Sequence, residues 1–331
     1  MPNPKPSVLI TRANGFVGAR LCHKLLLEGF EVIAGVRETS DRRSLEALNV
    51  SYRFGDVTEP AGLGEMVDGV DFVVHNAGVV KARRNETFAR VNEEGTRALM
   101  EALTDRNPSV RRVVYMSSLA AAGPSINGVP VQESDPAHPV TTYGASKLAG
   151  EKAALSYAER FEVVALRPSG VYGPGDKELL SLFETVHKRF RPLIGDMRRK
   201  IQLVHVDDLA RGVFLALTGS AQSGQVYNIA ENRAYTMDEL IAQVAAGVGR
   251  KGLPLPIPGP IFKGLAAVSE TLFRMLGAAP MLTLEKAGEL LASWEISTEK
   301  ARQDLGFQSC IPLEQGVRET YQWYLREGWL R

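Results

Sequence analysis

The stretch Ser7–Val36 reads SVLITRANGFVGARLCHKLLLEGFEVIAGV. Its first and last segments, 7–11 and 31–36, are apolar runs typical of short buried strands. Between them apolar residues recur at helical spacing as far as Gly29, a residue that favours the end of a helix. Strand, glycine turn, helix and strand form a βαβ unit, which places the turn and the start of the helix where a pyrophosphate can bind. The stretch therefore predicts a parallel sheet with a dinucleotide site.

The apolar pattern beyond Val36 repeats this alternation. We expect strands at 51–54, 71–75, 111–116 and 163–166, and helices over about 87–104 and 143–160. The alternation stops after Pro168, which marks the start of a second lobe. Beyond this point we expect a helix at 176–190, a strand at 201–206, a helix capped by Asp207 and Asp208 and ending at Leu217, a strand at 225–229, and helices at 236–248 and 313–326.

These elements predict an α/β fold: a doubly wound parallel sheet of the Rossmann type with a smaller C-terminal α/β lobe. We expect the dinucleotide-binding domain in residues 1–172 and 201–230. The substrate lobe and the C-terminal helices are expected in residues 173–200 and 231–331.

The composition excludes several classes of partner. Lysine and arginine number 39 against 38 aspartate and glutamate, so the net charge of +1 provides no basic field for nucleic acid. No apolar run is long enough to span a bilayer, and the start, MPNPKPS, lacks the apolar core of a signal peptide. Cys22 and Cys310 are expected to be reduced thiols of a cytoplasmic protein, neither a disulfide nor part of a metal site.

The motif YGASK places Tyr143 and Lys147 four residues apart, on one face of a predicted helix. A free tyrosine ionises at about pH 10, and a cation beside it favours the phenolate and lowers its pKa. Tyr143 therefore suits a general acid or base for interconverting an alcohol and a carbonyl. Such a pair also occurs by chance on solvated helix faces, so its interpretation depends on the rest of the chain.

Three turns follow predicted strands and are expected at one edge of the sheet: Gly55-Asp56-Val57, Asn76-Ala77-Gly78 and Ser117-Ser118. Turns of small residues let a cofactor approach the backbone. Ser118 is placed to meet Tyr143 and to orient a carbonyl by a hydrogen bond. His205, within VHVDD, is expected to be a structural histidine.

The end of the second strand bears on the choice of cofactor. An acidic residue at this distance from the glycine turn would bind the ribose 2′-hydroxyl of NAD. This chain has Arg37, followed by Arg42 and Arg43, and arginine suits a bidentate grip on a 2′-phosphate. NADP is therefore favoured. NAD is the alternative, with Glu38 taking the acidic role by a shift of one residue.

Several motifs, in their order and spacing, resemble those of extended short-chain dehydrogenases/reductases, the NAD-dependent epimerase/dehydratase superfamily. They cover essentially the whole chain: TRANGFVG, GDV, HNAG, YMSSLAAAG, YGASK, LRPSGVYGPG, QLVHVDD and WEISTEKARQDLGF. The segment VRETSDRR, QLVHVDD and the C-terminal third are most similar to bacterial relatives of 3β-hydroxysteroid dehydrogenases and dihydroflavonol reductases.

The resemblance implies Ser118, Tyr143 and Lys147 as catalytic residues. Lys147 would hold the nicotinamide ribose and lower the pKa of Tyr143, which would pass a proton to the substrate oxygen. The implied cofactor-binding residues are Arg12, Asn14, Gly15, Phe16, Val17, Gly18, Arg37, Asp56, Val57, Asn76, Ala77, Gly78, Lys147, Pro168 and Val171.

The resemblance also implies a homodimer that pairs the helices beginning near Thr87 and Tyr143. An apolar stripe on the solvent side of these helices would form the interface. The residues available for it are Leu99, Leu103, Leu148 and Leu155, which core packing could also use.

Arg12 departs from the family pattern T-G-x-x-G-F-x-G, which has a glycine at this position, whereas Gly15 and Gly18 are in place. Two outcomes follow physically. Arg12 joins Arg37 on a 2′-phosphate, which is the favoured alternative, or it strains the turn and obstructs the cofactor.

The substrate is open between three classes. Residues 119–122, LAAA, follow Ser118 without a hydroxyl or a carboxylate, which favours a reductase or dehydrogenase of an apolar ketone or alcohol. A nucleotide-sugar epimerase is the first alternative, and its candidate cations for a diphosphate are Arg198, Arg199 and Lys200. A non-enzymatic cofactor sensor is the second, and Arg12 supports it.

The interval 253–281 is rich in proline and apolar residues. Its apolar side chains recur at helical spacing: Ile261, Leu265, Val268, Leu272, Met275 and Leu276. We expect them either to pack as core or to form an amphipathic wall over an apolar substrate, with peripheral contact to a membrane surface.

Overall fold

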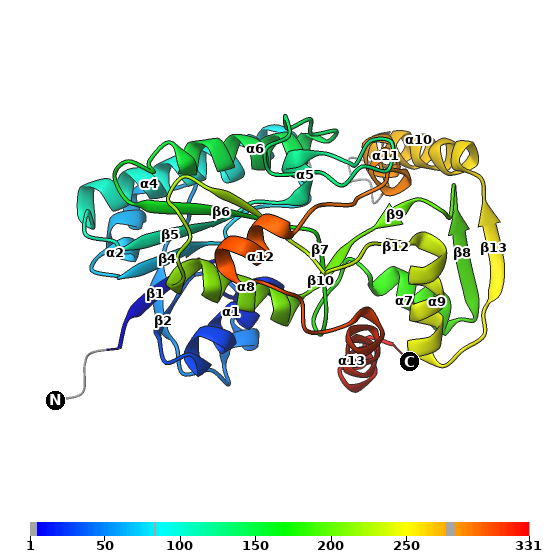
Figure 1. Ribbon diagram of the computed structural model, residues 1–331, viewed down its shortest axis with the longest axis horizontal. Coiled ribbons are helices and arrows are strands. Elements are labelled where there is room, and N and C mark those ends of the chain that lie inside the picture. Colours follow the sequence, from blue (N-terminus) through cyan, green and yellow to red (C-terminus); the bar gives the residue numbers. More distant parts are fainter. Residues whose placement is uncertain (1–4, 83, 276–281, 331) are drawn as a thin grey trace.

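A computed structural model describes residues 5–82, 84–275 and 282–330 (Figure 1). A seven-stranded sheet forms one half of the molecule. In spatial order its strands are β11 (Val226–Ile229), β6 (Glu162–Pro168), β5 (Arg112–Met116), β4 (Phe72–His75), β1 (Ser7–Thr11), β2 (Glu31–Val36) and β3 (Ser51–Phe54). All pairings are parallel, and Ser7 of β1 lies opposite Glu31 of β2. The predicted doubly wound sheet is confirmed.

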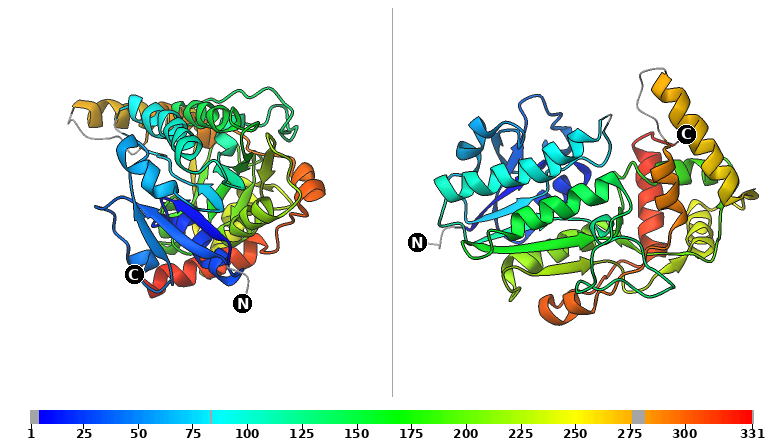
Figure 2. Two further views of the ribbon diagram at one scale, coloured as in Figure 1. Left: turned by 90° about the vertical axis from the view of Figure 1, so that its left-hand side faces the viewer. Right: turned by 90° about the horizontal axis from the view of Figure 1, so that it is seen from above.

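Alternate side chains of β1 enter two separate cores, as the two-residue period of a strand requires. Val8 and Ile10 pack with helices α1 (Phe16–Leu27), α8 (Val206–Thr218) and α12 (Glu299–Leu305). Leu9 packs on the other face with α4 (Gly95–Arg106) and α6 (Thr142–Leu155). Helices therefore cover both faces of the sheet, which a parallel sheet needs (Figure 2).

The shorter elements of this half connect the strands. They are the 3₁₀ turns Arg43–Leu45 and Pro60–Gly62, α2 (Leu63–Val67), α3 (Glu86–Ala89), a π-helical segment Arg90–Glu94 that joins α3 to α4, and α5 (Leu119–Ala122). The helix predicted over 87–104 is therefore confirmed, but it contains a π turn. The helix predicted to reach residue 160 ends at Leu155, because residues 156–160 form tighter turns such as Tyr157 N–H to Ala154 C=O.

The second lobe combines short ribbons with helices. The paired strands are β7 (Gly170–Tyr172) with β10 (Leu203–His205), β9 (Lys200–Ile201) with β12 (Tyr235–Thr236), and β8 (Phe190–Ile194) with β13 (Leu253–Ile257). Its helices are α7 (Leu180–His187), α9 (Met237–Val248), α10 (Gly259–Met275), α11 (Leu284–Leu291) and α13 (Leu313–Arg326). A core of Phe183, Leu240, Val317 and Tyr324 joins α7, α9 and α13.

Two helices predicted for the lobe are confirmed. Thr236 forms a capping box with Glu239 at the start of α9, and α13 spans the predicted residues. The single helix predicted over 176–190 is wrong, since the Asp176 carboxylate accepts the N–H groups of Glu178 and Leu179 and Phe190 already begins β8.

Two further boundaries in the lobe differ from the predictions. The strand predicted over 201–206 is two strands, β9 and β10, and α8 begins at Val206 with His205 as the capping residue instead of Asp207 or Asp208. Strand β13 and helix α12 were not predicted. The prolines of β13 are tolerated because it pairs on one side only, with β8.

The expected dimer stripe is wrong for two of its four residues. Leu99 and Leu103 are fully buried in the sheet core, whereas Leu148 and Leu155 are partly exposed. The homodimer stays a prediction. Among the helices of the described residues, none combines the length and the apolar character needed to cross a bilayer. Cys22 is buried, Cys310 is exposed, and both are free thiols.

Candidate active site

Helix α6 begins with a side-chain cap and presents Tyr143 and Lys147 one turn apart. The Thr141 hydroxyl accepts the N–H of Gly144 at 2.9 Å. Tyr143 is partly buried, with its ring centre 6.3 Å from that of Phe88, and Lys147 is only 4% exposed. The pair therefore faces the protein interior, and the alternative of a solvated helix face is wrong.

Lys147 is held beneath the carboxyl end of β5. Its Nζ donates to the Met116 carbonyl at 2.5 Å and lies 4.5 Å from the centre of the Tyr115 ring. Burial lowers the pKa of Lys147 to about 7, the Glu151 carboxylate opposes this shift, and the Arg12 guanidinium adds to it. A lysine with this pKa changes charge near neutrality.

Glu151, one turn beyond Lys147, ties α6 to the sheet. Its carboxylate accepts the Ser117 hydroxyl at 2.6 Å and two guanidinium N–H groups of Arg167 at 2.9 and 2.6 Å. The Glu151 and Arg167 side chains are 3% and 6% exposed. Because Ser117 directly follows β5 and Arg167 lies in β6, these contacts fix the position of Lys147 relative to the strand ends.

Ser118 caps the short helix α5, and its hydroxyl accepts the N–H of Ala120 at 3.1 Å. Gly144 allows Ser118 to lie close to Tyr143, because a Cβ at Gly144 would lie 2.3 Å from the Ala120 carbonyl oxygen. Burial raises the pKa of Tyr143, while a hydrogen bond with Ser118 and the charge of Arg12 lower it. In this structure the groups that lower the pKa of Tyr143 are thus Ser118 and Arg12, whereas the sequence suggested Lys147.

The glycine turn leaves the start of α1 accessible to an anion. Gly15 caps the helix, and a Cβ at Gly18 would lie 2.4 Å from the Arg12 carbonyl oxygen, so the turn needs glycine there. The amide of Asn14 donates to the Asp41 carbonyl at 2.9 Å. Phe16 and Val17 form the first turn of α1, which carries no acidic residue. These features fit the pyrophosphate of a dinucleotide.

Arg12 occupies the left-handed region with φ 52°, a conformation that favours glycine. Its guanidinium donates to the Gly78 carbonyl, on the side of the turn nearer to Lys147. Arg37 is 66% exposed and pairs with Asp56 at 3.7 Å. Arg12 contacts the Gly78 carbonyl, and burial together with the charge of Arg37 lowers its pKa, so the two guanidinium groups lie within electrostatic range. That both bind a 2′-phosphate stays a prediction.

The turn Asn76-Ala77-Gly78 is fixed to β1. The N–H groups of Asn76 and Ala77 both donate to the Thr11 hydroxyl, at 3.0 and 2.8 Å. A Cβ at Gly78 would lie 3.0 Å from Asn92 Oδ1 and 3.6 Å from Lys147 Nζ. Gly78 therefore contacts Arg12 through its carbonyl and lies beside Lys147.

Asn92 is a residue of this site that sequence reasoning missed. It is fully buried in the π-helical segment. Its Oδ1 accepts the Val79 N–H at 2.9 Å, and its Nδ2 donates to the Ser146 hydroxyl at 2.9 Å and to the Val79 carbonyl at 3.2 Å. A carboxamide on the buried side of a helical pattern was the available signal, since such a group needs partners.

The remaining predicted cofactor-binding residues lie in strands or shortly after them. They are Asp56, Val57, Pro168 and Val171. Pro168 ends β6 opposite Ile229, and Val171 lies in β7 opposite Val204. Asp56 accepts the N–H of Thr58. The Val57 side chain packs into the sheet core against Gly95. Val171 packs against the core on the other face of the sheet, and Pro168 is also buried.

The other candidate side chains are engaged elsewhere. Arg43 binds Asp41 at 2.6 Å, and Arg42 stacks 5.5 Å from the centre of the Tyr52 ring. Of the proposed diphosphate cations, Arg198 binds Asp196, Arg199 donates to backbone carbonyls, and Lys200 pairs with Glu295. His205 is buried, accepts the Asp207 N–H and packs on the ring of Tyr172, as expected of a structural residue.

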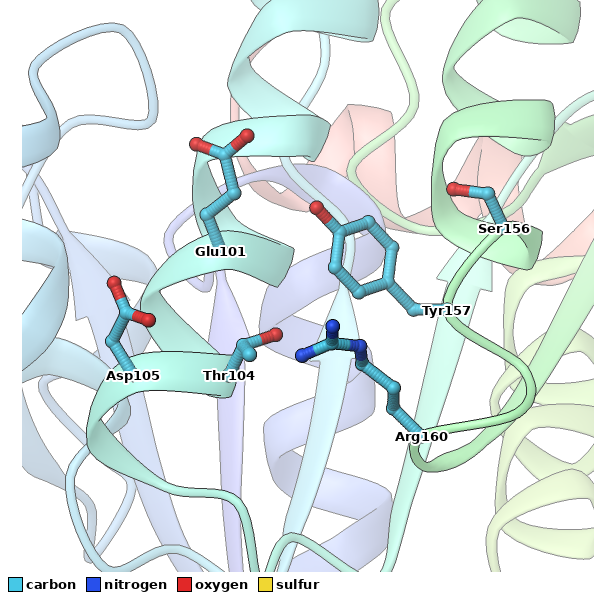
Figure 3. Close-up of a pocket in the computed structure, with 6 residues that line it drawn as sticks. All are labelled: Glu101, Thr104, Asp105, Ser156, Tyr157 and Arg160. Atoms are coloured by element: carbon cyan, nitrogen blue, oxygen red, sulfur yellow. The ribbon is translucent and has the colours of Figure 1, made fainter.

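A polar hollow of about 470 Å³ lies between α4 and the far end of α6 (Figure 3). It is lined by Glu101, Thr104, Asp105, Ser156, Tyr157 and Arg160. Tyr157 follows Tyr143 by 14 residues, which is roughly 20 Å along a helix. The hollow is therefore separate from the site around Tyr143.

Comparison with known proteins agrees with this geometry. The family model described as "NAD dependent epimerase/dehydratase family" matches residues 8–230. A ceramide reductase of Caulobacter vibrioides is 30% identical over 326 residues, 98% of this chain and 96% of that protein. A 3-beta-hydroxysteroid dehydrogenase of Mycolicibacterium neoaurum is 28% identical over 340 residues, with coverages of 96% and 91%. A crystal structure of gox2253 superposes with a TM-score of 0.84 at 27% identity, covering 99% of this chain and 100% of that one. The expected likeness to extended short-chain dehydrogenases/reductases and to steroid dehydrogenases is confirmed.

Proposed function

Because the chain belongs to the NAD dependent epimerase/dehydratase family, we propose that it is an NADP-dependent oxidoreductase that interconverts a ketone and a secondary alcohol on an apolar, lipid-like substrate. The observation that carries the proposal is the meeting of Ser118 and Tyr143 above the buried Lys147. An acid, its hydrogen-bond partner and a cation at the carboxyl edge of the sheet are what carbonyl reduction requires.

The chain's residues supply the proton and the orientation. The Ser118 hydroxyl donates to the substrate carbonyl and aligns it, and Tyr143 gives its phenolic proton to the carbonyl oxygen. Lys147, in its charged form, stabilises the resulting phenolate, which regains a proton from solvent. When bound, the nicotinamide supplies the hydride in reduction and accepts it in oxidation. Gly15, Gly18 and the start of α1 would hold its pyrophosphate, and Lys147 its ribose.

Three observations support an apolar substrate. The two relatives carry names that refer to ceramide and to a steroid, both largely hydrocarbon. Arg198, Arg199 and Lys200 are bound to other protein groups, which leaves the diphosphate of a nucleotide sugar without its suggested partners. Exposed Val80 and Val140 lie on the loops next to Gly78 and Thr141. Leu119 and Ala122 do not add to this apolar surface, because they pack into a small core with Val131, Ala230 and Ile296.

Arg37 supports NADP over NAD. It stands at the end of β2, is largely exposed, and has one carboxylate neighbour at 3.7 Å. A guanidinium in this position suits a 2′-phosphate and leaves the pair of ribose hydroxyls of NAD without the acidic partner that usually binds them.

The test compares wild type with Tyr143→Phe, using NADPH with a long-chain ketone and a 3-ketosteroid. We expect turnover to fall by roughly 10³-fold, as for loss of a general acid, while the Kd of NADPH stays unchanged. Tyr157→Phe, at the far end of the same helical region, is the matched control and should retain wild-type turnover. A Tyr143→Phe protein with most of its kcat refutes the assignment. Copurified NAD with turnover of a UDP-sugar indicates an epimerase, and cofactor binding without any turnover indicates a sensor.

A further inference from the structure

Helix α10 carries an apolar stripe that no described part of the chain covers. Its residues recur every three or four positions, so they share one face over four turns. They are Ile261, Leu265, Val268, Leu272 and Met275, exposed by 57, 56, 66, 52 and 79%. Phe262 and Ala266 face the protein instead and pack with Ala287 of α11. Figure 2 shows α10 at the outer edge of the lobe.

The ribbon that leads into α10 extends this apolar surface. Leu253 and Leu255 of β13 are 67% and 45% exposed. Alternate residues of a strand face the same side, so Leu253 and Leu255 share one side of the ribbon. Phe190, opposite Leu253 on β8, is 44% exposed. The docking surface, as we define it, consists of the α10 stripe with Phe190, Leu253 and Leu255.

Basic side chains gather at the start of the same ribbon. Strands β8 and β13 run parallel, so the residues just before each of them lie together, and the Leu253 N–H donates to the Arg189 carbonyl. The cluster is Lys188, Arg189, Arg250 and Lys251. Within the described residues none of these four side chains forms an ion pair with a carboxylate. The cluster adjoins Phe190 and Leu253, at the end of the ribbon opposite α10 (Figure 1). Basic side chains next to exposed apolar ones suit the binding of anionic lipid headgroups.

The docking surface adjoins the opening of the site. The Leu284 N–H donates to Glu270 of α10, which joins α11 to α10. Glu285 of α11 in turn accepts the backbone N–H of Thr142, the residue before Tyr143. The charge of Glu289, one turn further along α11, raises the pKa of Tyr143. The hairpin of α10 and α11 therefore stands over the tyrosine.

We propose that the docking surface binds the face of an anionic phospholipid bilayer and holds the opening beside Tyr143 against the membrane. The apolar stripe enters the boundary between headgroups and acyl chains, and the basic cluster contacts the headgroups. A bilayer fits better than a second copy of the chain, because the four cations of the basic cluster have no carboxylate partner among the described residues and complement anionic headgroups. Binding does not require the substrate class proposed above and can be measured without turnover.

The experiment is sedimentation of the full chain with vesicles of phosphatidylcholine alone and of phosphatidylcholine mixed with phosphatidylglycerol. We expect binding to the mixed vesicles and weaker binding to the neutral ones. The variant L265E/L272E should lose roughly tenfold or more in affinity, and K188E/K251E should lose the preference for phosphatidylglycerol. Leu27→Glu is the matched control, since Leu27 is 71% exposed on α1, away from the docking surface.

All five substituted positions are on the surface, and circular dichroism checks that each variant is folded. Wild type that stays in the supernatant with both vesicles overturns the proposal. So does L265E/L272E that binds like wild type. A wild-type dimer in sedimentation velocity that becomes monomeric in L265E/L272E, without any vesicle binding, assigns the surface to a second copy instead.

Discussion

Gly78 lies beside two cations, and the cations are held in opposite ways. Lys147 is buried, its Nζ is bound to the Met116 carbonyl, and the Glu151–Arg167 pair fixes its helix. Arg12 lies on the open side, where it contacts the Gly78 carbonyl from a residue with positive φ. Lys147 is therefore positioned by a network of buried hydrogen bonds and an ion pair. Arg12 is positioned by a single hydrogen bond and by a backbone conformation that is strained for a residue other than glycine.

This difference indicates two kinds of sensitivity. A change on the Lys147 side removes one member of a desolvated network, so it should affect folding and charge state strongly. A change on the Arg12 side alters one exposed contact and relieves local strain, so it should affect cofactor affinity mildly.

The largest expected effect is on stability. Glu151→Ala leaves the buried Arg167 guanidinium unpaired, so we expect the free energy of unfolding to fall by about 3–5 kcal/mol. Urea titration followed by circular dichroism measures it. Glu299→Ala, which removes an exposed ion pair with Arg302 on α12, is the control and should leave the midpoint near that of wild type. Equal shifts for both variants would show that the Glu151 network does not anchor α6.

The second effect is a pH dependence set by Lys147. The pKa of about 7 lies far below the ordinary 10.5, so the unfolded chain binds more protons between these values, and stability should rise with pH across this window. Bound pyrophosphate and ribose favour the ammonium and raise the pKa. NADPH affinity should therefore be greatest below about pH 7 and fall by up to about tenfold per pH unit above it.

Titration of NADPH by intrinsic fluorescence at several pH values measures this slope. Lys147→Met is the control, because it keeps most of the side-chain volume and removes the titrating group. The same slope in Lys147→Met would assign the pH dependence to another residue.

The smallest effect separates the two arginines. Arg37→Ala should weaken NADPH by roughly tenfold and leave NADH unchanged, as expected for a charged hydrogen bond to a 2′-phosphate. Arg12→Gly should change both affinities by the same factor, because the guanidinium is held by the Gly78 carbonyl, although Arg12 is close enough to Arg37 for the Arg37 charge to add to the effect of burial in lowering the Arg12 pKa. Titrating both nucleotides on both variants tests this. Selective loss of NADPH in Arg12→Gly would instead place Arg12 on the 2′-phosphate.

The sheet half could be read from the sequence because its signals are local. The apolar runs of β1 and β2, the glycines at 15 and 18 and the spacing of Tyr143 and Lys147 each specify structure within a few residues. The capping box at Thr236 predicted α9 for the same reason.

The remainder depends on contacts between distant segments. The pairing of the proline-bearing β13 with β8 follows from tertiary packing and leaves no periodic pattern. The Asp176 turn that shortens α7 is a local contact instead, and the apolar spacing used to predict the helix does not include it. Helical spacing of the α10 side chains was visible, but spacing alone does not say whether such a face is covered. The direction of Arg12 depends on the position of Gly78, which is 66 residues away in the chain.

The π-helical segment Arg90–Glu94 limits which insertions and deletions this helix can accept. A π turn holds one more residue than an α turn, and the close contact of Gly150 with the Asn92 carbonyl depends on that extra residue. Deleting one residue here would restore a regular α-helix and rotate everything before the deletion by about 100° relative to α4. The Asn92 carboxamide would then leave Val79. Insertions and deletions in this helix are therefore coupled to the site, although the helix itself lies on the outside of the sheet.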